Sequence, residues 1–148
     1  MSVDSKIIKK FKEALYSEGL RLTDQRLIIL EDIINSKEHR DCDQIYNSLS
    51  KRDHRVSKAT IYRTLDVLTD YGFARKLDIG DGSIMYETKL DSPHHDHMIC
   101  VETGKIIEFV DDRIERIQDE IARKKGYKII KHVHQLFVKP VKKWVLSY

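Results

Sequence analysis

The sequence predicts an α+β fold built from two parts, a helical N-terminal part that ends in a short hairpin and a small α/β C-terminal part. Two observations carry this prediction: apolar residues recur at helical spacing up to Tyr71, and short apolar runs separated by glycines follow. With 148 residues, of which 34% are charged and 41% hydrophobic, the chain has room for one ordinary domain or two small ones. We place the two parts at residues 1–88 and 94–148, with a hinge at about 87–93.

Four helices account for most of the N-terminal part. Gly19 can end the first helix, and Thr23 and Ser57 are suitable N-caps for the second and the fourth. We expect Thr64 on the exposed polar face of the fourth helix. The expected helices cover residues 6–18, 23–35, 43–49 and 58–71. The expected core stripe of the fourth helix consists of Ile61, Leu65, Val67 and Leu68.

A two-stranded wing is predicted after the fourth helix, at about residues 73–88. Residues 72–77 and 84–87 have the composition of strands, and Gly80 and Gly82 supply the turn between them. A helix-turn-helix inserts the first two turns of its last helix into the major groove of DNA. The sequence therefore predicts a winged helix-turn-helix DNA-binding domain. The alternative is an ordinary four-helix bundle with a solvated basic face.

The expected DNA contacts lie mainly at the start of the fourth helix. We expect Arg63 and Tyr62 to contact bases, because arginine can donate to guanine and a tyrosine ring can pack on a thymine methyl. The net charge is only +3, so any nucleic-acid binding must come from a local patch. The other expected contacts, at phosphates or in a narrow minor groove, are Arg21, Ser57, Lys58 and Thr60.

Composition also indicates where the protein is located and which roles its cysteines can have. No stretch approaches the roughly 20 apolar residues of a membrane helix, and the N-terminal residues lead into an amphipathic helix, so we expect a cytoplasmic protein with no membrane partner. Cys42 and Cys100 are the only cysteines, and they form no C-x-x-C pair. We therefore expect neither a disulfide framework nor a structural zinc bound by four cysteines.

The C-terminal part is predicted to contain three strands and one helix. Residues 98–101 and 105–109 read as a hairpin around Gly104, and residues 128–138 alternate loosely like another strand. Asp111 or Asp112 can cap a helix that runs to Lys125, and its apolar stripe is expected at Ile114, Ile117 and Ile121. A module of about 55 residues has a thin core and exposed strand edges, so we expect it to dimerise.

The run His94-His95-Asp96-His97 beside the first of these strands is a candidate metal site. Imidazole and carboxylate ligands suit divalent first-row metals such as Fe²⁺, Mn²⁺ and Zn²⁺. Side chains on an extended chain alternate between faces, so His95 and His97 share one face, and His94 and Asp96 share the other. The segment can thus contribute to two sites. The alternative is a polar loop in which the histidines occur by chance.

These features together resemble the ferric uptake regulator (Fur) family of metal-dependent repressors. The motifs that carry the resemblance are Gly19-Leu20-Arg21-Leu22-Thr23-x-x-Arg26, Ala59-Thr60-Ile61-Tyr62-Arg63-x-Leu65, Tyr86-Glu87, His94-His95-Asp96-His97-x-x-Cys100 and Gly104-Lys105-x-Ile107-Glu108-Phe109. The resemblance implies a homodimeric repressor of metal-uptake genes that binds AT-rich palindromic DNA. It implies Fe²⁺ as the regulatory ion, for which Mn²⁺ or Zn²⁺ can substitute.

The resemblance also implies two sets of metal ligands. The regulatory site between the domains would comprise His39, Glu87, His95, His97 and Glu108. The second site, within the dimerisation module, would comprise His94, Asp96, Glu115 and His132. His54 and His134 have no counterpart among these ligands, and we expect them to be surface residues or to support a ligand. The chain departs from many family members in lacking the C-x-x-C pairs of a structural zinc site.

Two alternatives compete with an iron-responsive repressor. One is a regulator of the same fold that responds to manganese or haem. The other is a small non-haem iron enzyme, because His94, Asp96 and His132 superficially fit a facial triad. The chain lacks the run of strands that such an enzyme's barrel needs, so we expect no enzymatic activity and no small-molecule substrate.

Overall fold

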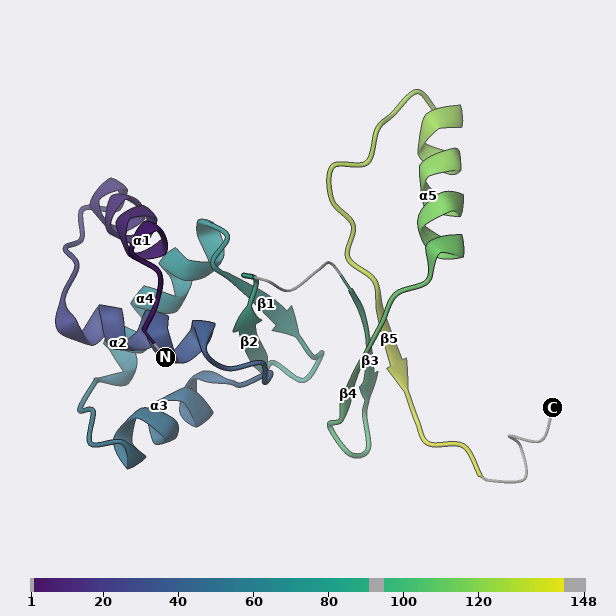
Figure 1. Cartoon of the computed structure of the whole chain (residues 1–148). Coiled ribbons are helices and arrows are strands. Elements are labelled where there is room, and N and C mark those ends of the chain that lie inside the picture. The colour runs from purple at the N-terminus through teal and green to yellow at the C-terminus, as the bar shows by residue number, and fades with distance from the viewer. Residues whose placement is uncertain (1, 91–94, 143–148) are drawn as a thin grey trace. The chain divides into compact units, whose positions relative to one another are not determined.

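The computed structural model describes residues 2–90 and 95–142, and the chain divides between Pro93 and His94 into two compact units (Figure 1). Part of the expected hinge at 87–93 lies outside the described residues. No helix in the described ranges is long and apolar enough to span a bilayer. Unit 1 contains α1 (Ser5–Ser17), α2 (Asp24–Ile34), α3 (Cys42–Lys51), α4 (Lys58–Asp70), β1 (Ala74–Asp78) and β2 (Ile84–Thr88). Unit 2 contains β3 (Asp96–Cys100), β4 (Ile106–Phe109), α5 (Asp112–Lys124) and β5 (Gln135–Val138).

Side-chain caps set where the helices of unit 1 begin. The N-caps predicted at Thr23 and Ser57 are confirmed, since each side chain accepts a hydrogen bond from a backbone N–H three residues later. The third helix is longer than predicted. Asp41 and Gln44 form a reciprocal capping box, with both hydrogen bonds between 2.7 and 2.8 Å, and this box starts α3 at Cys42.

Helix α4 lies at the centre of unit 1 and packs against α1, α2, α3 and β1. The predicted core stripe of α4 is confirmed, because Ile61, Leu65, Val67 and Leu68 are all buried. Thr64 was predicted on the exposed face, and this was wrong. Its side chain is fully buried, and its hydroxyl donates to the Thr60 carbonyl at 2.7 Å, which satisfies the hydroxyl inside the core.

The wing predicted after α4 is confirmed. Strands β1 and β2 pair antiparallel from Ala74 opposite Thr88 to Asp78 opposite Ile84. The turn between them places Gly80 and Gly82 at φ 87°, a conformation that residues with a Cβ rarely adopt. Strand β2 also makes a separate two-bond bridge to Arg40, because Tyr86 and Arg40 exchange backbone hydrogen bonds of 2.7 and 3.1 Å.

The sheet of unit 2 has the order β4-β3-β5. Strands β3 and β4 form the predicted antiparallel hairpin around Gly104, and β5 lies parallel to β3 on its other side. The last strand was predicted over 128–138, but only Gln135–Val138 is strand. The register explains the difference, because Gln135 already lies opposite His97, near the start of the five-residue β3.

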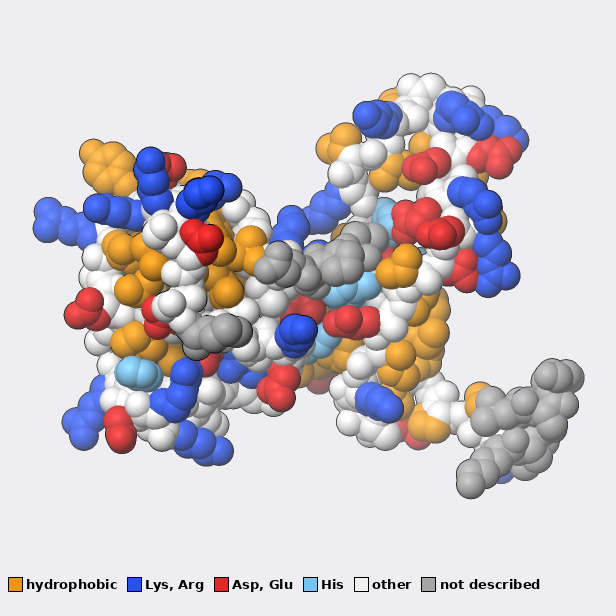
Figure 2. All heavy atoms as spheres, in the orientation of Figure 1, with side chains coloured by type: hydrophobic (Ala, Val, Ile, Leu, Met, Phe, Trp, Pro, Cys, Tyr) orange, Lys and Arg blue, Asp and Glu red, His pale blue; other side chains and the backbone are white. Residues whose placement is uncertain are grey.

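Helix α5 begins at Asp112 after the N-cap Asp111, whose carboxylate accepts hydrogen bonds from the Arg113 backbone and guanidinium. These bonds lower the pKa of Asp111 to about 2. The helix has no buried residue, and Ile117 and Ile121 of its expected apolar stripe are 57% and 53% exposed. Figure 2 shows further hydrophobic side chains on the surface of unit 2.

We predict that the phenol of Tyr86 ionises late. Burial raises its pKa to about 12, against about 10 in an unfolded chain. Because the folded-state value is raised, the contribution of Tyr86 to stability is complete below about pH 10 and is lost as the pH rises towards about 12. An alkaline titration followed at 295 nm should show a late phase that Tyr86→Phe removes. An unchanged titration curve in Tyr86→Phe would contradict the prediction.

Candidate functional site

The start of α4 presents most of the residues predicted to contact DNA. Ser57 caps the helix through the Thr60 N–H at 3.2 Å, and Lys58 and Arg63 are exposed. Tyr62 is 50% exposed. This end of α4 thus offers hydroxyl, ammonium, guanidinium and aromatic groups on one exposed surface, which is the mixture that DNA recognition uses.

Lys58 already has a protein partner. Its ammonium donates to the Asp43 carboxylate of α3 at 2.9 Å and lies 5.3 Å from the centre of the Tyr46 ring. The hydrogen bond to Asp43 raises the pKa of Lys58. Both side chains of the pair are more than half exposed, so the pair contributes little stability and can be exchanged for a phosphate at small cost.

Arg21 lies apart from this group in the chain, in the segment between α1 and α2. Its side chain is exposed, and its carbonyl accepts a hydrogen bond from the Arg26 guanidinium. The segment is therefore anchored through its backbone. The Arg21 side chain remains exposed for a contact outside the protein.

His39 and Glu87 form one pair of predicted metal ligands inside unit 1. The His39 Nε2 lies 2.9 Å from the Glu87 Oε2. His39 directly precedes Arg40, and Glu87 directly follows Tyr86. The backbone bridge between Arg40 and Tyr86 therefore holds the two side chains close together. Arg75 approaches the other oxygen of Glu87 at 3.6 Å. The pair is thus built from the loop before α3 and from the wing.

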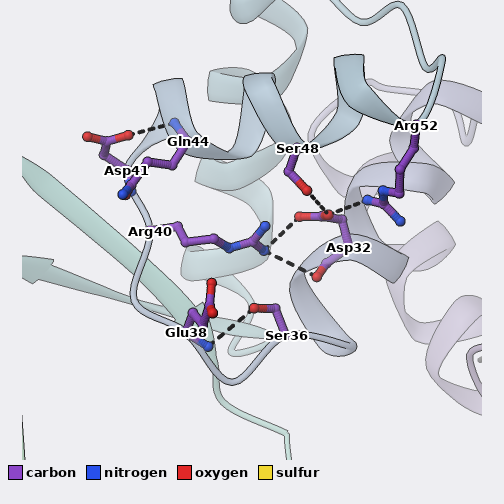
Figure 3. Close-up of polar contacts among 8 residues, drawn as sticks. All are labelled: Asp32, Ser36, Glu38, Arg40, Asp41, Gln44, Ser48 and Arg52. Carbon is purple, nitrogen blue, oxygen red and sulfur yellow. Dashed lines mark hydrogen bonds and ion pairs between the residues drawn. The ribbon is translucent and has the colours of Figure 1, made fainter.

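A buried carboxylate holds the loop that carries His39 (Figure 3). Asp32 of α2 is 6% exposed, and its Oδ2 accepts a hydrogen bond from the buried Arg40 guanidinium at 2.7 Å. Its Oδ1 is bonded by Arg52 and by Ser48 of α3. Asp32 therefore links the loop that carries His39 to α3. This role of Asp32 was not predicted, although an aspartate within an apolar helical run was a signal of it.

Three predicted ligands of the regulatory set come together within unit 2. The His95 Nε2 lies 3.2 Å from the Glu108 Oε1, and the rings of His95 and His97 meet edge to face with their centres 4.7 Å apart. His97 and Glu108 are direct partners across the β3–β4 pair. The regulatory set is therefore divided, with two predicted ligands in unit 1 and three in unit 2.

Members of the second predicted set come together at the other face of β3. The His132 Nε2 lies 2.9 Å from the Asp96 Oδ1 and 3.5 Å from the Glu115 Oε1. One donor atom of each of the three residues lies within 4.8 Å of the others. Asp96 is 1% exposed. The predicted ligand His94 lies outside the described residues.

The donor atoms of these groups suit a divalent first-row cation. Each group contains at least one imidazole and one carboxylate, and none contains a thiolate. Among the described members of the second set, the carboxylates of Asp96 and Glu115 both approach the His132 imidazole, so a bound cation would balance the negative charge of the carboxylates. Cys42 belongs to α3 of unit 1, where burial raises its pKa, and Cys100 belongs to β3 of unit 2.

One residue near the second set was not predicted as a ligand. The Nδ1 of His134 lies 3.9 Å from the Asp96 Oδ2. The spacing His132-x-His134 was a signal for it, because alternate residues of an extended chain point to the same side. His54 belongs to unit 1 and is in neither group of ligands.

Comparison with known proteins shows which family the chain is similar to. The model of the ferric uptake regulator family matches residues 17–137. The ferric uptake regulation protein of Rhizobium leguminosarum bv. viciae is 36% identical over 137 residues, covering 93% of this chain and 96% of the relative. That of Campylobacter jejuni is 37% identical over 133 residues, covering 88% and 84%.

Solved structures of ferric uptake regulators are also similar to this chain. The ferric uptake regulator of Helicobacter pylori, described with three functional metal-binding sites, has a TM-score of 0.81 at 31% identity and covers 91% of this chain and 89% of its own. The regulator of Pseudomonas aeruginosa with manganese has a TM-score of 0.76 at 33% identity and covers 88% and 97%. The predicted fold class is thereby confirmed, and an enzymatic function is excluded because the family consists of transcription regulators. The chain belongs to the ferric uptake regulator family of metal-responsive, DNA-binding transcriptional regulators.

Proposed function

We propose that the protein is a homodimeric, metal-activated repressor of metal-uptake genes that binds AT-rich palindromic operators, with Fe²⁺ as its co-repressor. One observation supports this above the others: nitrogen and oxygen donors are paired in unit 1 at His39 and Glu87, and a second group stands in unit 2 at His95, His97 and Glu108. Neither group contains enough protein ligands to complete a shell of four to six. An ion shared by the two units would take ligands from both groups.

Such sharing would couple the ion to DNA binding. We propose residues 1–88 as the DNA-binding domain and residues 94–148 as the dimerisation domain. If the five residues of the regulatory set bind one cation, the ion favours the arrangement in which the two domains are tied together. Couplings of this kind are typically about 1–3 kcal/mol, or about 5-fold to 150-fold in affinity. In a symmetric dimer, the ion would set the spacing of the two α4 helices to match two half-sites.

On the DNA we assign Arg63 and Tyr62 to base edges, and Arg21, Ser57, Lys58 and Thr60 to the backbone or a narrow minor groove. The exposed, polar and cationic start of α4 supports this assignment. Lys58 would exchange Asp43 for a phosphate on binding. A regulator of this kind acts in the compartment that holds the DNA. In bacteria, to which the organisms of the relatives belong, that compartment is the cytoplasm.

The partner in the dimer is a second copy of this chain. Helix α5 buries no residue within its own chain, and the buried apolar side chains of unit 2 are, among the described residues, Ile99 and Cys100. A unit of this size needs more buried apolar surface than that to be stable. Docking of α5 and the sheet against a second copy would supply it. We propose that the second metal site, at His94, Asp96, Glu115 and His132, strengthens this module.

The donor chemistry supports Fe²⁺ or Mn²⁺, since a nitrogen and oxygen shell without thiolate suits both ions, while Zn²⁺ would bind more tightly. A manganese-responsive regulator of the same fold is therefore the second candidate. It is favoured by the likeness to a zinc-bound manganese uptake regulator, with a TM-score of 0.63 at 35% identity over 89% of this chain. A haem-responsive regulator has no comparable observation in its favour.

The test compares operator affinity of the metal-free protein with that of the Fe²⁺, Mn²⁺ and Zn²⁺ forms. We expect loading with the physiological ion to strengthen binding by about 5-fold to 150-fold. His39→Ala should abolish this response, His132→Ala should retain it, and His54→Ala serves as a matched control outside both groups. Equal affinity of the stripped and loaded proteins would refute the proposal. A response that survives His39→Ala but not His132→Ala would reverse the roles of the two sites.

A further inference from the structure

We propose that His134 is a further metal ligand of the second site, beside Asp96, Glu115 and His132. The inference rests on the proposal that this site holds a cation. It goes beyond the ligands assigned so far, because the family resemblance implies no role for His134. The site would then receive two imidazoles from the segment that leads into β5, instead of one.

The backbone fixes His134 beside Asp96. The His134 carbonyl accepts a hydrogen bond from the His97 N–H at 3.2 Å, which attaches the residue to β3 next to the aspartate. His132 stands two residues earlier in the same segment, so both rings can point to the same side. The His134 and Phe109 rings also meet edge to face, with centres 5.8 Å apart and planes at 80°. A hydrogen bond therefore holds the backbone of His134, and the Phe109 ring contacts its side chain.

The two imidazoles approach the two oxygens of a single carboxylate. The His132 Nε2 lies 2.9 Å from the Asp96 Oδ1, and the His134 Nδ1 lies 3.9 Å from the Asp96 Oδ2. The second distance is too long for a hydrogen bond. It is close to the spacing of two ligands of one ion, because donors about 2.1 Å from a tetrahedral cation lie about 3.4 Å apart. A change in the position of the His134 side chain would bring its nitrogen into the shell.

The chemistry of the site would change with this ligand. Imidazole suits Zn²⁺ and Fe²⁺, whereas carboxylate and water suit Mn²⁺. A second imidazole beside the carboxylates of Asp96 and Glu115 therefore favours the binding of Zn²⁺ or Fe²⁺ over that of Mn²⁺ at this site. The His134 side chain is 29% exposed and Asp96 is 1% exposed, so the site is sheltered on the carboxylate side and open near His134. An ion could enter there.

The first measurement identifies the coordinated nitrogens in the whole chain, residues 1–148. Histidine ring nitrogens are followed by ¹⁵N correlation spectra while Zn²⁺ is added. We expect the His134 Nδ1 to show the shift of a metal-bound nitrogen together with the His132 ring. If the His132 ring shifts on addition of Zn²⁺ while the His134 nitrogens keep their metal-free shifts, the inference about His134 is overturned. The proposed second site would still stand in that case.

The second measurement uses the variants His134→Ala and His134→Gln, with His54→Ala as control and His132→Ala as the reference for a disabled site. We expect His134→Ala to weaken Zn²⁺ binding at this site by about tenfold or more. His134→Gln should fail to rescue it, because an amide retains hydrogen bonding but is a poor ligand for Zn²⁺. Full rescue by glutamine would show a positioning role instead and overturn the inference. Unchanged binding in His132→Ala would overturn the second site itself and this inference with it.

Discussion

Replacing Asp32 with alanine is expected to lower the free energy of unfolding of the DNA-binding unit by about 3–5 kcal/mol. The substitution leaves the guanidinium of Arg40, whose side chain is 10% exposed, buried without its carboxylate, and such uncompensated charges are costly. It also removes the bonds from Ser48 and Arg52 that join α2 to α3 (Figure 3). Chemical denaturation followed by circular dichroism measures the loss.

Arg52→Ala is the matched control for this prediction. Arg52 binds the same carboxylate, but its side chain is 52% exposed, so its removal should cost no more than about 1 kcal/mol. Asp32→Ala should also weaken the metal response of the folded protein, because Asp32 holds Arg40 and Arg40 immediately follows His39. Equal losses of stability in the two variants would show that burial of the Arg40 pair is not the cause.

Replacing Ile117 with glutamate is expected to dissociate the proposed dimer. Ile117 is 57% exposed in the single chain, and α5 would bury it against the second copy. A carboxylate in that interface would be desolvated without a partner. Loss of the dimer also removes the simultaneous binding of two half-sites, so operator affinity should fall by about 100-fold or more. Analytical ultracentrifugation reports the mass, and a gel-shift titration reports the affinity.

Arg116→Glu provides the comparison, because it adds a carboxylate at the neighbouring exposed position and keeps a good helix-forming residue. This variant should remain dimeric. A dimer that persists in Ile117→Glu at micromolar concentration would mean that α5 is not part of the interface.

Local signals made most of the fold predictable. Thr23 and Ser57 were recognisable caps, and the glycines of the wing turn and of the β3–β4 hairpin marked the reversals. Interactions between distant residues were not predictable. The length of β5 depends on where β3 begins, and the burial of Thr64 depends on the helices packed around α4.

Local alternation predicted only how residues 94–97 divide between two faces, whereas the other candidate ligands came from the family resemblance. Strand alternation separates the rings of His95 and His97 from Asp96, and in the structure those rings meet each other while Asp96 meets His132. The approach of His134 to Asp96 required the parallel pairing of β5 with β3, which spacing along the chain does not reveal.

The bridge between Arg40 and Tyr86 gives the wing a mechanical connection to the ligand loop. Its two hydrogen bonds use only main-chain atoms, so the connection does not depend on which side chains occupy those positions, and a proline at either one would remove one of the two bonds. The bridge therefore limits how far His39 and Glu87 can move apart without breaking main-chain hydrogen bonds.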